Sequence, residues 1–192
     1  MEGRGRAAEE RQREDPQAGH PRHLRSVSAL TGPKPDLKPV LPAAFAAGAT
    51  LRTPGRTLTS GDFAAIINAT WENGPLHTDD VYMSGTGFGR RILGGPCLLA
   101  IAAGLSSPTM YASWAAAGLD CHAALGIDEV RYEAPVFEND TITVDVEVHT
   151  LEPTPGGSAF VGRVRDVVRK QDGTAVLTMR RGYLLKPIAE DT

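Results

Sequence analysis

The chain has 192 residues, of which 41% are hydrophobic, and its formal net charge at pH 7 is −3. These values predict one domain of ordinary size and give no reason to expect nucleic acid or an anionic membrane as partner. The sequence has neither a bilayer-spanning apolar run nor a signal-peptide hydrophobic region, so we expect a cytoplasmic protein. Cys97 and Cys121 lack metal-ligand spacing, which favours reduced thiols and no bound metal.

Residues 1–48 are predicted to be a disordered N-terminal extension. Up to about Lys38 this stretch mixes charged residues, glutamine and proline with few apolar positions. Such a composition buries too little surface to offset the entropy lost on ordering. One folded domain is therefore expected over residues 49–188.

The first elements of the domain are a strand and short helices. Residues 51–58 are a candidate strand that Pro54-Gly55 interrupts, and Thr59 and Asp62 have the spacing of a capping box for a helix ending near Thr70. Residues 72–77 then form a loop, followed by a short helix over residues 78–82. Gly95 is the expected N-cap of the next helix, which has Pro96 in its first position.

That next helix is the predicted centre of the domain. Residues 97–105 are apolar on every face, which indicates burial on all sides, and residues 108–118 form a further, looser helix. The hydrophobic period then changes to two, with strands predicted over residues 123–132, 141–149, 160–169 and 175–185. Residues 138–140 form a turn, and Asp172-Gly173 favours a type I′ hairpin. The result is an α+β architecture, a single hotdog domain in which a curled antiparallel β-sheet wraps around a central apolar helix.

A candidate site lies at the start of this central helix. Glu72, Asn73 and His77 precede it by some twenty residues, and Gly94 and Gly95 lead into it. A carboxylate, a histidine and free helix amides are the groups needed for proton transfer beside a developing oxyanion. By themselves the residues leave other readings open. On residue type alone His77 is more often a surface or helix-start residue, and Glu72 is as often a solvated loop carboxylate.

This segment resembles the MaoC-like dehydratases, the (R)-specific enoyl-thioester hydratases of the hotdog fold. Their signature reads Asp-x-Asn-Pro-[Ile/Leu]-His, followed by a loop ending in Phe-Gly-x-x-Ile-x-His-Gly before the central helix. The matching residues here are Pro75, Leu76, His77, Phe88, Gly89, Ile92 and Gly95. The stretch 125–136 also looks like the family's second strand. The resemblance extends over about residues 49–186.

Three positions depart from the family pattern. The aspartate five positions before the histidine is Glu72, and the asparagine three positions before it is Gly74, although Asn73 stands beside it. The histidine before the helix glycine is Gly94. The resemblance implies catalytic roles for Glu72 and His77.

The helix start completes the predicted site. We expect Gly95, Gly94, Asn73 and Cys97 to contribute to oxyanion stabilisation or substrate binding, because amides and a dipole are available there. Cys97 would have a lowered pKa if its thiol were exposed, but an apolar helix more often buries such a residue.

The function implied by the resemblance is reversible dehydration of a 3-hydroxyacyl thioester, linked to CoA or a carrier protein, without metal or redox cofactor. A homodimer is also implied. Three alternatives stay open. The first is a non-hydrating acyl-thioester-binding protein or partner subunit. The second is an enzyme repurposed for another addition, elimination or cyclisation, and the third is a thioesterase. The Pro75-Leu76-His77 segment argues against the thioesterase.

Overall fold

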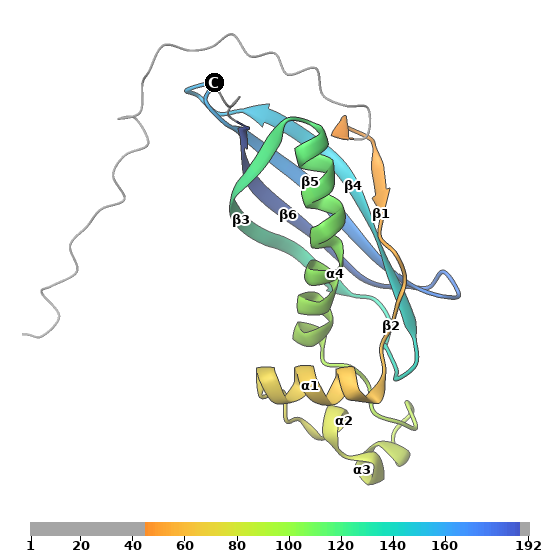
Figure 1. Ribbon diagram of the computed structural model, residues 1–192. Helices are drawn as coiled ribbons and strands as arrows, with labels where there is room; N and C mark the ends of the chain where they lie inside the picture. Colours follow the sequence, from red (N-terminus) through yellow and green to blue (C-terminus); the bar gives the residue numbers. More distant parts are fainter. Residues whose placement is uncertain (1–44, 189–192) are drawn as a thin grey trace, which may run out of the picture. The chain divides into compact units, whose positions relative to one another are not determined.

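The computed structural model describes residues 45–188. In this part of the chain four helices and six strands follow one another, with the sheet formed mainly after the longest helix (Figure 1). The elements are β1 (Thr50–Arg52), β2 (Arg56–Thr57), α1 (Ser60–Thr70), α2 (Pro75–Thr78), α3 (Asp80–Ser84), α4 (Gly95–Ala116), β3 (Leu119–Tyr132), β4 (Thr141–Pro153), β5 (Phe160–Lys170) and β6 (Ala175–Pro187).

The strands form a single antiparallel sheet in the order β1-β4-β5-β6-β3, with β2 also pairing with β4. In β4 the buried residues Ile142, Val144, Val146 and Val148 alternate with more exposed ones, as the period of two predicted. Figure 1 shows α4 running along one face of this sheet. The predicted α+β hotdog fold is therefore confirmed.

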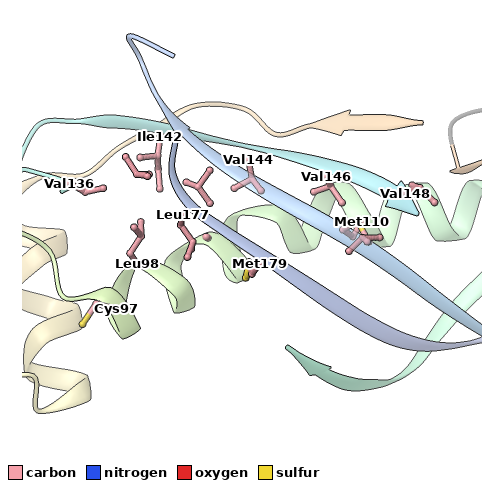
Figure 2. Packing of buried hydrophobic residues seen from close by; sticks show 14 of the residues in the cluster. Cys97, Leu98, Met110, Val136, Ile142, Val144, Val146, Val148, Leu177 and Met179 are labelled. Atoms are coloured by element: carbon pink, nitrogen blue, oxygen red, sulfur yellow. The ribbon is translucent and has the colours of Figure 1, made fainter. Parts of the chain in front are cut away.

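The core lies between α4 and the sheet. In Figure 2, Leu98 of α4 points toward the sheet, where Ile142 of β4 and Leu177 of β6 lie, whereas Cys97 points away from the sheet. These side chains are at most 3% exposed. Because α4 packs against strands that lie far along the chain, the whole sheet determines where the start of α4 lies.

Helix α4 differs from its prediction in length. It is one helix of 22 residues with Pro108 inside it, rather than a helix to residue 105 followed by a looser one. Proline removes the hydrogen bond to the carbonyl four residues earlier, which here belongs to Gly104. Gly104 lies on the exposed side of α4, where water can satisfy that carbonyl. The helix therefore continues through the proline.

The prediction that α4 is buried on all sides is wrong for this chain by itself. Its buried residues repeat every four positions along one face, and the opposite face is exposed. The buried face consists of Cys97, Leu98, Ala102, Ser106, Met110 and Trp114. The exposed positions include Ala100, Gly104, Pro108 and Ala112. The sheet covers only one side of the helix, which leaves small apolar residues uncovered on the other.

The packed part of the chain includes Phe45, four residues before the predicted domain start. Phe45 is 1% exposed, and its ring meets Trp114 of α4 edge-on with a centroid distance of 6.4 Å. An aromatic side chain buried in this way is part of the core. Residues 1–44 of the predicted extension lie outside the described residues.

A buried ion pair connects the sheet to α4. Arg181 of β6 lies 2.6 Å from the Asp166 carboxylate of β5 and donates a hydrogen bond of 2.8 Å to the Ser106 hydroxyl of α4. Asp166 is fully buried, and this burial raises the pKa of its carboxyl to about 6. The pair joins three elements within the otherwise mainly apolar core.

Two local signals are confirmed and a third is not. The Thr59–Asp62 capping box begins α1, and the interruption at Pro54-Gly55 separates β1 from β2. The turn between β5 and β6 is not type I′, because Gly173 has a positive φ but Asp172 does not. Within residues 45–188, no helix has the length and apolarity to cross a membrane. Both cysteines are free.

Candidate active site at the start of the central helix

His77 lies in α2 rather than in the predicted loop. Pro75 occupies the first turn of this helix and Gly74 is its N-cap, so the chain turns directly after Glu72. The imidazole is almost fully buried, and its Nδ1 lies 2.8 Å from the Ile92 carbonyl oxygen. A carbonyl only accepts, so Nδ1 carries the proton. In its neutral form the ring therefore presents the lone pair of Nε2.

That lone pair faces Glu72. The distance from His77 Nε2 to Glu72 Oε1 is 3.8 Å, which exceeds a direct hydrogen bond but allows one oxygen atom to contact both groups. The two side chains are 11% and 34% exposed, respectively. Glu72 and His77 come close together because Trp71, with its left-handed backbone (φ 59°), ends α1 and reverses the chain. The structure thus brings the two predicted catalytic residues together.

Gly94 and Gly95 lie at the N-terminus of α4, one position out of the predicted register. Gly94 is the N-cap and Gly95 the first helical residue, while the Leu98 amide already donates to the Gly94 carbonyl. Pro96 has no N–H and Gly94 has no side chain to cap the helix. The helix geometry therefore leaves the amides of Gly95 and Cys97 without a partner inside the helix, with the dipole adding positive character. Gly95 lines a cavity beside His77, whereas Cys97 is fully buried.

Tyr132, at the end of β3, lies against the same helix end. A Cβ atom built on Gly95 would be 2.8–3.0 Å from three atoms of the Tyr132 ring. The phenol pKa is raised, mainly by burial and then by the charges of Cys97 and Glu72. The sequence predicts Tyr132 only as part of a strand. Because the strand must end at Pro135, the sequence does indicate that Tyr132 lies near the end of this strand, at the edge of the sheet.

A cavity of about 320 Å³ opens beside His77. It lies between α2, the start of α4 and the end of β3, and apolar side chains form most of its wall. The lining residues include His77, Phe88, Gly95, Leu98, Tyr132 and Val136. This size and character suit a small, mainly apolar group bound next to a titratable side chain.

The side chains of Asn73 and Cys97 lie apart from this arrangement. The Cys97 thiol is fully buried, and its sulfur lies 3.2 Å from the Thr70 hydroxyl. Asn73 is exposed, and its backbone N–H donates to the Trp71 carbonyl. Within residues 45–188, no cluster of three His, Cys, Asp or Glu side chains is placed to hold a metal ion.

The chain is similar to proteins of one family. Residues 43–165 match the family described as MaoC like domain. No curated protein sequence matches the chain. A monoamine oxidase regulatory protein from Archaeoglobus fulgidus is a solved structure with 28% identity and a TM-score of 0.66, and the match covers 74% of this chain and 91% of that one.

Two further structures support the fold at lower identity. The (R)-hydratase from A. caviae, involved in PHA biosynthesis, has 22% identity and a TM-score of 0.56, covering 76% of this chain and 99% of that one. A chain of the ChsH1-ChsH2 complex from Mycobacterium tuberculosis has 19% identity and a TM-score of 0.53, covering 74% and 98%. Because the family match spans more than half of the sequence and contains the site residues, the chain belongs to the MaoC-like dehydratase family.

Proposed function

We propose that the chain is a hydro-lyase that interconverts 3-hydroxyacyl and enoyl thioesters linked to CoA or a carrier protein. The observation that carries this proposal is the pair of His77 Nε2 and Glu72 Oε1, 3.8 Å apart beside a mainly apolar cavity. Membership of a dehydratase family supports the reaction class. The acyl group would occupy the cavity, with its thioester carbonyl toward the start of α4.

The tautomer of His77 determines the order of proton transfers. With its Nδ1 proton held by the Ile92 carbonyl, neutral His77 begins as an acceptor at Nε2. A water between Nε2 and the Glu72 carboxylate gives one proton to His77 as its oxygen bonds to the β-carbon of the enoyl group. The resulting imidazolium is stabilised by Glu72 and then returns the proton to the α-carbon. The net change is addition of one water.

The N-terminus of α4 stabilises the intermediate of this reaction. As the β-carbon is attacked, negative charge moves to the thioester oxygen. The Gly95 amide, which lines the cavity, and the positive end of α4 stabilise that charge when the oxygen lies near them. Asn73 and the fully buried Cys97 have no part in this scheme.

An assay with a panel of short enoyl-CoA substrates tests the proposal. We expect loss of the conjugated enoyl absorbance without release of free thiol. Thiol release would identify a thioesterase instead. Neither change, together with measurable binding of the CoA ester, would favour an acyl-thioester-binding protein or partner subunit, the second candidate. The observation that favours this candidate is Glu72, which stands where the family pattern has an aspartate.

We also propose that the chain forms a homodimer. Two observations support this proposal: β3 pairs only with β6 within the described chain, and one face of α4 exposes small apolar residues. Leu125 and Ile127 of β3 are 53% and 42% exposed, and an uncovered strand of this length favours association. Sedimentation at micromolar concentration is expected to give a dimer. A monomer alone under those conditions would contradict the proposal.

A further inference from the structure

The reactive tautomer of His77 depends on the position of one carbonyl group. Nδ1 of the almost fully buried ring lies 2.8 Å from the Ile92 oxygen. The free neutral histidine side chain favours the other tautomer, with the proton on Nε2. In that form Nε2 has no lone pair to accept a proton from the attacking water. Because the hydrogen bond of one ring nitrogen determines which nitrogen is protonated, the contacts that hold the Ile92 carbonyl also hold the reactive form of His77.

Residues 91–93 are attached to several distant parts of the chain. The Ile92 N–H donates to the Leu76 carbonyl of α2, at 3.1 Å. The Leu93 N–H donates to the Val136 carbonyl, which lies between β3 and β4, at 2.9 Å. Residues 91–93 belong to no helix or strand, so their position depends on such long-range contacts.

The side chain of Arg91 supplies the other attachment. Its Nε lies 2.8 Å from a carboxylate oxygen of Asp80 in α3, and its Nη2 lies 3.0 Å from a carboxylate oxygen of Glu138. The guanidinium is rigid and planar, so contacts through two of its nitrogens fix both its position and its orientation. Arg91 and Glu138 are 28% and 26% exposed, whereas Asp80 is 72% exposed. The Glu138 contact is therefore less screened by solvent and should contribute more.

We propose that Arg91 is a positioning residue, which holds the Ile92 carbonyl in place and thereby keeps the proton of His77 on Nδ1. Arg91 does not line the cavity beside His77, so it acts through the neighbouring carbonyl rather than on the substrate. Its effect on the reaction rate rests on the proposed hydration at this site, whereas its effect on the tautomer does not.

Three substitutions test the effect on the rate. Without the Arg91 contacts the Ile92 carbonyl is expected to move, and Arg91→Ala should lower kcat for enoyl-CoA hydration by about tenfold or more, since a displacement of about 1 Å can cost a hundredfold. KM should change little, because the cavity wall is intact. Glu138→Gln keeps the shape of the side chain but removes its charge, and should lower kcat less. Arg91→Lys should resemble Arg91→Ala, because an ammonium group cannot make both contacts from one planar fork.

NMR of the ¹⁵N-labelled ring of His77 measures the tautomer directly, and comparison with His77→Ala assigns its signals. At a pH where the ring is neutral, the wild type should have its proton on Nδ1, and Arg91→Ala should show protonated Nε2. Arg52→Ala is the matched control, because Arg52 also makes two contacts with a carboxylate, that of Asp145 at 2.7 and 3.2 Å, but between β1 and β4. It should lower Tm slightly, as Arg91→Ala does, and leave the tautomer and kcat unchanged.

An Arg91→Ala variant with wild-type kcat and an unchanged His77 tautomer would overturn the inference. A loss of kcat with the proton retained on Nδ1 would overturn it too, since Arg91 would then act in another way. So would a wild-type His77 protonated on Nε2. If the wild-type chain hydrates no enoyl-CoA, the proposed function fails, and the tautomers of the wild type and of Arg91→Ala still decide whether Arg91 positions His77.

Discussion

His77→Ala and Glu72→Gln are each expected to lower kcat for enoyl-thioester hydration by about 100- to 10,000-fold, the range for removal of a general acid–base group. Alanine at position 77 removes the Nε2 lone pair that accepts the proton of the attacking water in the proposed reaction. Glutamine at position 72 keeps the shape of the side chain but removes the charge that stabilises the imidazolium 3.8 Å away. The double variant should be little worse than either single one, because paired groups act as a unit.

Two further variants separate chemistry from folding. Glu72→Asp should retain activity or raise it, because a carboxylate remains and Gly74 lets the backbone adjust. His149→Ala is the control, since His149 also faces a carboxylate, with its Nε2 4.0 Å from Glu147, but at an exposed position of β4. It should leave kcat unchanged. Full activity in Glu72→Gln would remove Glu72 from the mechanism.

Phe45→Ala is expected to lower the free energy of unfolding by about 3–5 kcal/mol, the usual cost of deleting a buried aromatic ring. Phe45 is 1% exposed and packs edge-on against Trp114, which is itself 2% exposed and in contact with Tyr183. The substitution leaves a cavity beside the last turns of α4. Chemical denaturation of the wild type and the variant measures the difference.

Two truncated proteins test which N-terminal residues contribute to the stability of the domain. Deleting residues 1–38 should change Tm little, because their composition supports no core. Deleting residues 1–48 removes Phe45 and should destabilise the protein about as much as Phe45→Ala does. Equal stability of the two truncated proteins would show that Phe45 contributes nothing to the fold. A large loss with the shorter deletion would contradict the predicted extension.

Much of the fold follows from local patterns in the sequence. The alternation from Ile142 to Val148 predicts β4 because a strand with one buried face requires that period. The capping box at Thr59 predicts the start of α1 because its two hydrogen bonds are local. The extent and burial of α4 were not predictable in this way. They depend on which face the sheet covers, and Pro108 is tolerated because it lies on the other face.

Long-range contacts explain a part of the core that the sequence pattern does not predict, the buried ion pair. The Asp166–Arg181 pair joins neighbouring strands to Ser106, which lies 75 positions before Arg181. Charged residues within a strand pattern predict a solvated face. Only the paired geometry makes their burial acceptable.

The candidate site likewise combines features that the local sequence predicts with features that depend on long-range contacts. Glu72 and His77 were predicted together because they are close in sequence. The proton on His77 Nδ1 is fixed by Ile92, fifteen positions later, and Tyr132 reaches Gly95 from a strand beyond α4. Neither the tautomer nor this contact has a signal in a single sequence.

NMR of crotonyl-CoA incubated with the full chain in D₂O tests the proposed hydration most directly. The account predicts a product with a hydroxyl on the β-carbon, one deuterium on the α-carbon and an intact thioester, and no such product with Glu72→Gln. Unchanged crotonyl-CoA, or crotonate and free CoA from cleavage of the thioester, would contradict it.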